Sequence, residues 1–144
     1  MAESDLHRKL VKGLADVIRR REECSWLLFV DAQDDCSQGC PPQLVSLRPD
    51  LYARDGRTGH ILIGEAKTAR DIENDHTAAQ LSMYFQHLST HPSAELMFAV
   101  SLMHAGLAYR FCNVIRKQAG CQHVPFQVSG WMFGPKTFMR VWRG

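Results

Sequence analysis

Three charged residues near the middle of the chain have the types and spacing to act together on one substrate. Asp50 follows Pro49, while Glu65 and Lys67 are separated by one residue at the end of an apolar run. Side chains in a strand alternate between two faces, so Glu65 and Lys67 are expected to point the same way. If Asp50 lies on the partner strand of a hairpin that turns at residues 55–57, it lies beside Glu65. Two carboxylates and one ammonium group would then meet at one point.

This set of groups suits chemistry on a phosphate. Carboxylates are hard oxygen ligands for Mg²⁺ or Mn²⁺, and Mg²⁺ keeps several waters and takes substrate phosphates as further ligands. We expect Asp50 and Glu65 to hold the ion at the scissile phosphate. A bound divalent ion makes its water a better nucleophile, and Lys67 can orient that water or stabilise the charge that develops. The three residues predict phosphodiester hydrolysis by a metal-activated water.

Hydrophobic periodicity predicts the elements that must position these residues. Helices are expected at about 5–23, 75–89 and 107–117, with Ser4 and Asp75 as N-caps of the first two. Strands are expected at 26–30, 43–54, 60–68, 96–103, 126–133 and 137–142, and a loop at 34–42. The order α-β-β-β-α-β-α-β-β predicts an α/β fold in which helices flank a mixed central sheet.

Two motifs in this order resemble a known family. Arg48-Pro49-Asp50, fourteen intervening residues and Glu65-Ala66-Lys67 are similar to the signature of the PD-(D/E)xK nuclease superfamily. Gln80-Leu81-Ser82-Met83-Tyr84 resembles the QxxxY motif of its RecB-type and lambda-exonuclease-type branch. The resemblance implies a restriction-endonuclease-like α-β-β-β-α-β core. It also implies a Mg²⁺- or Mn²⁺-dependent deoxyribonuclease that acts on DNA in repair or recombination, phage replication or defence.

The resemblance extends the site to residues outside the three charges. Gln80 and Tyr84 are one helical turn apart and share a face. The apolar stripe of their helix is carried by Ala78, Leu81, Phe85 and Leu88, so both are expected off its centre, bordering the site. Gln80 could fix the lysine or the metal-bound water, and Tyr84 could meet phosphate or stack on a base. A helix flank packed on the sheet edge is the alternative reading of the pair.

RecB-type enzymes also carry a histidine in the first helix as an extra metal ligand. His7 lies on the inward face of the first predicted helix and could fill that role. A histidine satisfied by its neighbours at a helix start is the alternative, and Asp5 and Glu3 compete for the same task. Acidic residues in a first turn are also simply favourable with the helix dipole.

Length and composition predict the class of protein to which these residues belong. The 144 residues, 45% of them apolar, predict a single domain over 1–144. The net charge of +2 means that a polyanion must be held by local clusters of charge. The N-terminus has no leader pattern and no apolar run approaches the ~20 residues of a membrane span, which predicts a soluble cytoplasmic protein. Five cysteines without zinc-site or iron–sulfur spacing predict reduced thiols.

The C-terminal third contains basic residues interleaved with aromatic ones. These could contact phosphates and bases, or could be a solvated helix face and a charged edge hairpin. The basic residues are Arg110, Arg116, Lys117, Lys136, Arg140 and Arg143.

One alternative to a nuclease is a catalytically silent module with the same fold, which binds nucleic acid or a protein partner. The sequence leaves the oligomeric state open: cutting two strands needs two sites and would favour a homo-oligomer, and a larger repair, phage or defence complex is the other possibility.

Overall fold

The computed structural model describes residues 4–21, 25–31 and 39–144, which form a mixed α/β fold. The helices are α1 (Asp5–Arg19), α2 (Asp75–Ser89) and α3 (Ala105–Gln118), with short 3₁₀ turns at η1 (Ala69–Asp71) and η2 (Leu102–His104). The strands are β1 (Trp26–Val30), β2 (Leu51–Asp55), β3 (Ile61–Ala66), β4 (Ala94–Ser101), β5 (Phe126–Met132) and β6 (Phe138–Arg143). The order of helices and strands is the one that the hydrophobic periodicity predicts.

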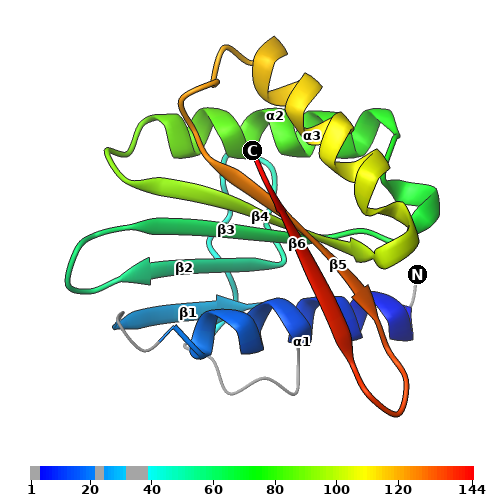
Figure 1. The fold of residues 1–144 in the computed structure, drawn as a ribbon. Helices are drawn as coiled ribbons and strands as arrows, with labels where there is room; N and C mark the ends of the chain where they lie inside the picture. The colour runs from blue at the N-terminus through cyan, green and yellow to red at the C-terminus, as the bar shows by residue number, and fades with distance from the viewer. Residues whose placement is uncertain (1–3, 22–24, 32–38) are drawn as a thin grey trace.

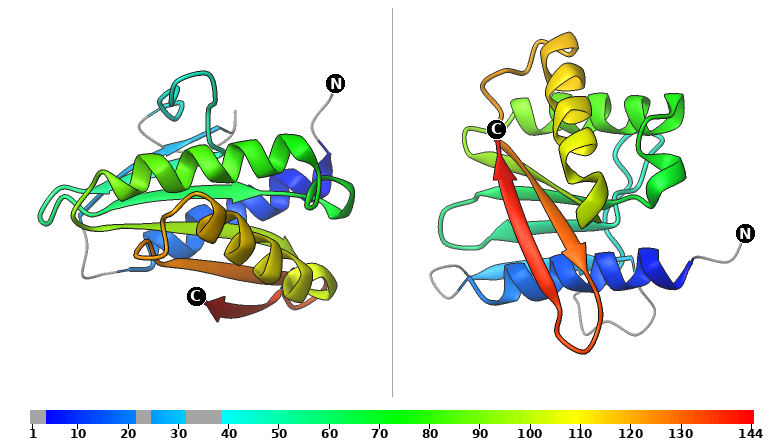
Figure 2. Two further views of the ribbon diagram at one scale, coloured as in Figure 1. Left: turned by 90° about the horizontal axis from the view of Figure 1, so that it is seen from above. Right: turned by 45° about the vertical axis from the view of Figure 1, so that its right-hand side comes forward.

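All six strands form one mixed sheet in the order β1-β2-β3-β4-β5-β6. β1, β2 and β3 pair antiparallel, β4 is parallel to both β3 and β5, and β6 returns antiparallel to β5. The two parallel connections contain α2 and α3. Both crossovers step in the same direction across the sheet, so their helices lie on one face, while α1 covers the other (Figures 1 and 2).

The first helix begins and packs as its sequence predicts. The Ser4 hydroxyl accepts a hydrogen bond from the His7 backbone N–H at 3.1 Å, which caps α1. Leu10, Leu14 and Ile18 recur at helical spacing and are fully buried against the sheet. Gly64 in β3 makes this packing close, because a Cβ there would lie 3.3 Å from Cδ1 of Leu14.

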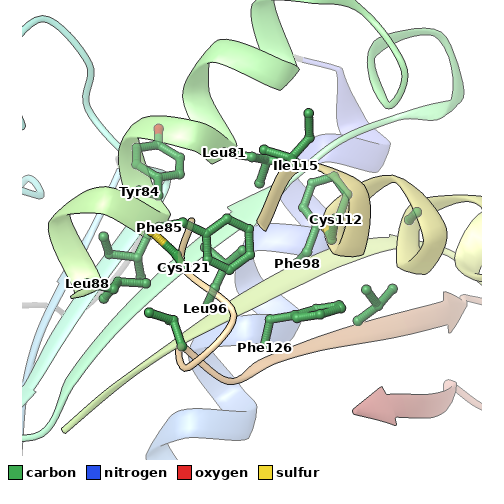
Figure 3. Close-up of a cluster of buried hydrophobic side chains, with 14 of the residues drawn as sticks. Leu81, Tyr84, Phe85, Leu88, Leu96, Phe98, Cys112, Ile115, Cys121 and Phe126 are labelled. Carbon is green, nitrogen blue, oxygen red and sulfur yellow. The ribbon is translucent and has the colours of Figure 1, made fainter. Parts of the chain in front are cut away.

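The sheet separates two hydrophobic cores. The larger core lies under α2 and α3 and includes Phe85, Phe98 and Phe126, which Figure 3 shows with their neighbours. The smaller core lies under α1. In β3, Ile61 and Ile63 belong to the larger core and Leu62 to the smaller one. The same alternation directs Glu65 toward the face that α2 covers.

The strand expected over 43–54 is wrong in its first two thirds, since only Leu51–Asp55 is a strand. Residues 44–47 form a tight turn in which the backbones of Leu44 and Leu47 exchange two hydrogen bonds, and Val45 has a φ of 59°. Pro41, Pro42 and Pro49 lack the backbone N–H that a ladder needs, which explains why pairing begins only after Asp50.

Other differences are confined to the ends of elements. The cap of α2 is Asn74, whose side chain accepts from the Thr77 N–H at 2.7 Å, rather than Asp75. Strand β4 lies two residues earlier than expected at each end, and α1 ends at Arg19. Part of the predicted loop at 34–42, and the last predicted residues of the first helix, lie outside the described residues. Among the residues described, no helix is long and apolar enough to cross a membrane.

Candidate active site

Asp50 and Glu65 lie side by side at one end of the sheet. Leu51 pairs with Gly64, and the antiparallel register continues to place Asp50 opposite Glu65. The Asp50 backbone N–H donates to Oε2 of Glu65 at 3.2 Å, and the Ala66 N–H donates to Oδ2 of Asp50 at 2.9 Å. The hairpin therefore brings the two carboxylates together, as its register predicts.

Lys67 completes a charged group of three. Its Nζ lies 3.4 Å from Oε1 of Glu65, and both side chains are largely buried. Lys67 is one residue beyond β3, yet its backbone N–H donates to Ala99, so the chain is still extended there. Burial, followed by the negative charge of Asp50, raises the pKa of Glu65 to about 8, although Lys67 opposes the shift. One ammonium group does not offset the cost of burying this carboxylate beside a second one.

His7 reaches the same group from the first turn of α1. Its Nε2 lies 3.1 Å from Oδ2 of Asp50, and the two side chains are 22% and 14% exposed. Asp50 Oδ2 thus receives both the Ala66 N–H and the His7 ring. In this arrangement His7 is a hydrogen-bond partner that orients Asp50, and Nε2 is the ring nitrogen that makes the contact.

Gln80 and Tyr84 line the site from α2, but not at the flank of the helix as expected. Gln80 is 7% exposed and Tyr84 fully buried, while Ala78, expected in the stripe, is only partly buried. The helix is rotated so that both face the sheet, and Thr77 in its first turn is buried with them. Figure 3 shows the Tyr84 ring among the core side chains, with its hydroxyl oxygen pointing away from them.

The hydroxyl of Tyr84 lies beside Glu65 and Gln80. Oε1 of Gln80 and Oη of Tyr84 are buried and make no hydrogen bond of normal geometry among the described residues. Burial, and then the charges of Glu65 and Asp50, raise the pKa of Tyr84, so its hydroxyl keeps its proton. Two buried polar atoms beside the carboxylates are thus available to hydrogen-bond to water or to a bound group.

The donor set fits a hydrated divalent cation of the Mg²⁺ type. No group of three or more His, Cys, Asp or Glu side chains within residues 4–21, 25–31 and 39–144 is placed to hold a metal ion. Mg²⁺ is bound in proteins by one or two carboxylates together with waters and phosphate oxygens, so the pair of Asp50 and Glu65 meets its requirement. Gln80 and Tyr84 could then hydrogen-bond to water around the ion.

The remaining candidate ligands lie elsewhere. Asp5 pairs with Arg8 on the exposed side of α1, away from the carboxylates, and Glu3 lies outside the described residues. Cys112 and Cys121 are buried in the larger core, and burial raises the pKa of the Cys112 thiol, which keeps it protonated. Neither thiol has the character of a metal ligand or nucleophile.

A second polar cluster, which sequence reasoning missed, lies at the opposite end of β3 and β4. Ser93 Oγ lies 2.6 Å from Nδ1 of His60, and Glu95 contacts both His60 and Arg21. These residues are far apart in the sequence and follow no motif, so no signal in the sequence joins them. Because Arg21 neutralises Glu95, the cluster is best explained as an ion-pair network that ties the chain after α1 to the sheet.

Comparisons of this chain with protein-family models, with curated proteins and with solved structures found no match.

Proposed function

We propose that the protein is a metal-dependent nuclease that hydrolyses phosphodiester bonds in DNA. The observation that carries this proposal is the pair of adjacent carboxylates, the buried Glu65 and the partly buried Asp50, with Lys67 3.4 Å from Glu65. The order α1-β1-β2-β3-α2-β4 also supports a restriction-endonuclease-like core of the PD-(D/E)xK type. DNA is the proposed partner, and Mg²⁺ or Mn²⁺ the proposed cofactor.

Each residue of the site has a task in this proposal. The cation, when bound, supplies Lewis-acid chemistry at the phosphate and lowers the pKa of water. Asp50 and Glu65 hold it, and His7 and the Ala66 N–H keep the Asp50 carboxylate in place. Lys67 orients the attacking water and stabilises negative charge on the phosphate oxygens. Gln80 and Tyr84 position water or a phosphate oxygen through their buried polar atoms.

Cleavage of a labelled DNA strand in Mg²⁺ or Mn²⁺, with EDTA as the blank, tests the proposal. We expect wild-type protein to cleave, and Asp50→Asn and Lys67→Ala each to lower the rate about 100-fold or more. Glu95→Gln removes one negative charge, as Asp50→Asn does, at the opposite end of the sheet, where Glu95 pairs with Arg21, so it serves as the control. Equal rates in all four proteins would contradict the proposal.

A silent module of the same fold is separated from a nuclease by calorimetry with Mg²⁺ or Mn²⁺ alone. A nuclease binds the ion and loses it on Asp50→Asn, whereas a silent module shows no binding that depends on Asp50. The calorimetric result does not depend on the choice of DNA.

A further inference from the structure

A long groove runs between the exposed side of α1 and the β5–β6 hairpin. Two adjoining hollows of about 470 and 540 Å³ form it, and Lys9 and Phe133 line both of them. One hollow extends along α1 to Arg20, and the other extends past Leu6 to Ser101 at the end of β4. In Figure 1 the hairpin, in orange and red, crosses α1 on this side of the molecule.

Basic side chains form one wall of the groove. Lys9, Lys12 and Arg20 follow one line along α1, at spacings of three and eight residues, and all three are exposed. The helix rises about 16 Å from Lys9 to Arg20, which matches four or five stacked nucleotides at about 3.4 Å each. Asp16 is the acid within this line. Asp5, at the other end, is already paired with Arg8.

Aromatic and apolar side chains form the floor. The rings of Trp131 and Phe133 are stacked, with centroids 5.7 Å apart and planes 12° from parallel. Trp131 packs against Gly13 of α1 and is fixed by a 2.8 Å hydrogen bond to Ser129, so the stack is held rigidly. Phe133 is half-buried and faces the groove, while Met103 and Met132 are exposed along it.

This combination of wall and floor matches the chemistry of an unpaired nucleic acid strand. Lysine and arginine neutralise phosphates, and any base can stack on an aromatic ring, which a duplex does not offer to a protein surface. We propose that the groove between α1 and the β5–β6 hairpin holds single-stranded DNA, with its backbone on Lys9, Lys12 and Arg20 and a base on Phe133.

The groove leads to the candidate active site. Its end at Leu6 belongs to the helical turn that carries His7, and His7 contacts Asp50. Ser101, at the same end, lies two residues beyond Ala99, which pairs with Ala66 of β3. A strand in the groove therefore approaches, from the α1 side of the sheet, the end at which His7 contacts Asp50. The assignment of DNA as the strand rests on the proposed function, whereas the groove itself does not.

Binding of a fluorescent oligothymidine of about 20 nucleotides, measured by anisotropy in EDTA, tests this proposal without catalysis. We expect Lys9→Gln/Lys12→Gln to weaken binding roughly 20-fold at ~0.1 M salt and to lower the salt slope by about 1.4, the value for two phosphate contacts. Phe133→Leu keeps an apolar side chain but removes the ring, and should weaken binding about fivefold or more. Blunt duplex DNA of the same length should bind more weakly than the single strand.

The matched control is Arg110→Gln/Lys117→Gln, which removes the same charge from exposed positions on α3, across the sheet. We expect its affinity to stay within about twofold of wild type, since nonspecific charge alone changes little at ~0.1 M salt. A larger loss in this control than in the α1 variant would overturn the proposal, as would unchanged binding by the α1 variant, tighter binding of duplex, or no binding by wild type. Thermal unfolding checks that each variant is folded.

The two proposals fail in different ways. Groove-dependent binding by a protein that never cleaves DNA supports the strand-binding groove and contradicts the hydrolysis. Cleavage that persists while the α1 variant binds like wild type contradicts the groove and supports the hydrolysis.

Discussion

At the scale of single residues, Glu65 determines the character of the site. It is 2% exposed, its neighbour Asp50 has the same charge, and Lys67 is the nearest cation. A buried carboxylate in this position must be neutralised by a proton or by a metal ion. Its pKa of about 8 means that, without metal, the site holds a proton near neutral pH. A divalent cation would take the place of that proton.

Stability of the metal-free protein should therefore depend on pH through Glu65. Its pKa is about 8 in the folded chain and 4.5 ordinarily, so the folded state binds the proton more tightly. The resulting stabilisation is complete below pH 4.5 and is lost as the pH rises through about 8. We expect the melting temperature in EDTA to fall between about pH 5 and 8, and Glu65→Gln to flatten this fall. Parallel curves for the two proteins would show that Glu65 is not the cause.

Binding of Mg²⁺ should change the pH dependence of the melting temperature. Because a cation competes with the proton on Glu65, Mg²⁺ should raise the melting temperature more at about pH 8 than at about pH 5. Differential scanning calorimetry with and without Mg²⁺ measures both shifts. A larger shift at the lower pH would have the wrong sign for binding at Glu65.

His7 should act through Asp50. In the structure its Nε2 contacts Oδ2 of Asp50 at 3.1 Å. Loss of such an orienting contact typically costs about 10–100-fold in metal affinity or activity, so we expect this loss for His7→Ala. In His7→Gln the side-chain amide can still donate to Asp50, and most of the activity should return. Titration of the cleavage rate with Mg²⁺ checks both variants. Equal losses in the two would instead identify His7 as a metal ligand.

At the scale of elements, the placement of α1 depends on a glycine. A Cβ at Gly13 would lie 2.9 Å from Cη2 of Trp131, so the backbone of α1 packs directly against the indole ring from β5. This contact also forms the floor of the groove. Without it, alanine would stabilise a helix interior by about 1 kcal/mol relative to glycine. Whether Gly13→Ala stabilises or destabilises the protein therefore shows how closely α1 packs against Trp131.

Gly13→Ala should destabilise the protein by about 1–3 kcal/mol, because the new methyl group overpacks against Trp131. Gly106→Ala on α3 is the matched control, since its Cβ would meet only the flexible end of Arg110, at 3.8 Å. We expect the control to be neutral or slightly stabilising. Urea unfolding measures both changes, and a stabilised Gly13→Ala would contradict the close approach of α1 and Trp131.

The elements that the sequence predicts well have a regular pattern and a distinct end. In α1, leucines at helical spacing follow a capping serine, and both features agree with the structure. In the segment before Asp50, apolar residues alternate like a strand, but the prolines around them remove ladder donors. For α2, periodicity identifies the helix but not its rotation. Tyr84 belongs to the core because its ring packs there while its hydroxyl reaches the carboxylates.

In the candidate site, too, some features can be predicted from the sequence and others cannot. Strand alternation and hairpin register are local rules, so they place Glu65, Lys67 and Asp50 correctly relative to one another. The contact between His7 and Asp50 joins residues 43 positions apart, and it depends on how α1 packs across the sheet end. The Ala66 N–H that holds Asp50 is a backbone group, which leaves no sign in the sequence. Tertiary packing, rather than the local sequence pattern, determines these two contacts of Asp50.

At the scale of the whole molecule, the sheet has a protected centre and less protected edges. β3 and β4 lie between the two cores and are covered on both faces, whereas β1 and β6 are the outer strands of the sheet. Asp50, Glu65 and Lys67 lie where the central strand β3 ends. This position gives the three side chains a rigid support.

Hydrogen exchange should reveal this gradient. We expect amides of β3 and β4 to exchange only through global unfolding, and those of β1 and β6 to exchange faster through local opening. Mass spectrometry of peptides covering each strand measures the rates. Protection of β6 equal to that of β3 would contradict the edge position of the hairpin.

The rate of Mg²⁺-dependent DNA cleavage by Glu65→Gln, compared with Glu95→Gln, tests the central claim most directly. Both substitutions remove one carboxylate from neighbouring strands without changing shape, but Glu95 lies at the opposite end of the sheet, paired with Arg21. Glu65→Gln keeps the shape of the side chain, and thermal unfolding checks that a loss of activity does not come from a loss of structure. A metal-dependent site at Asp50 and Glu65 predicts a loss of about 100-fold or more for Glu65→Gln and cleavage within a few-fold of wild type for Glu95→Gln. Undiminished cleavage by Glu65→Gln would contradict it.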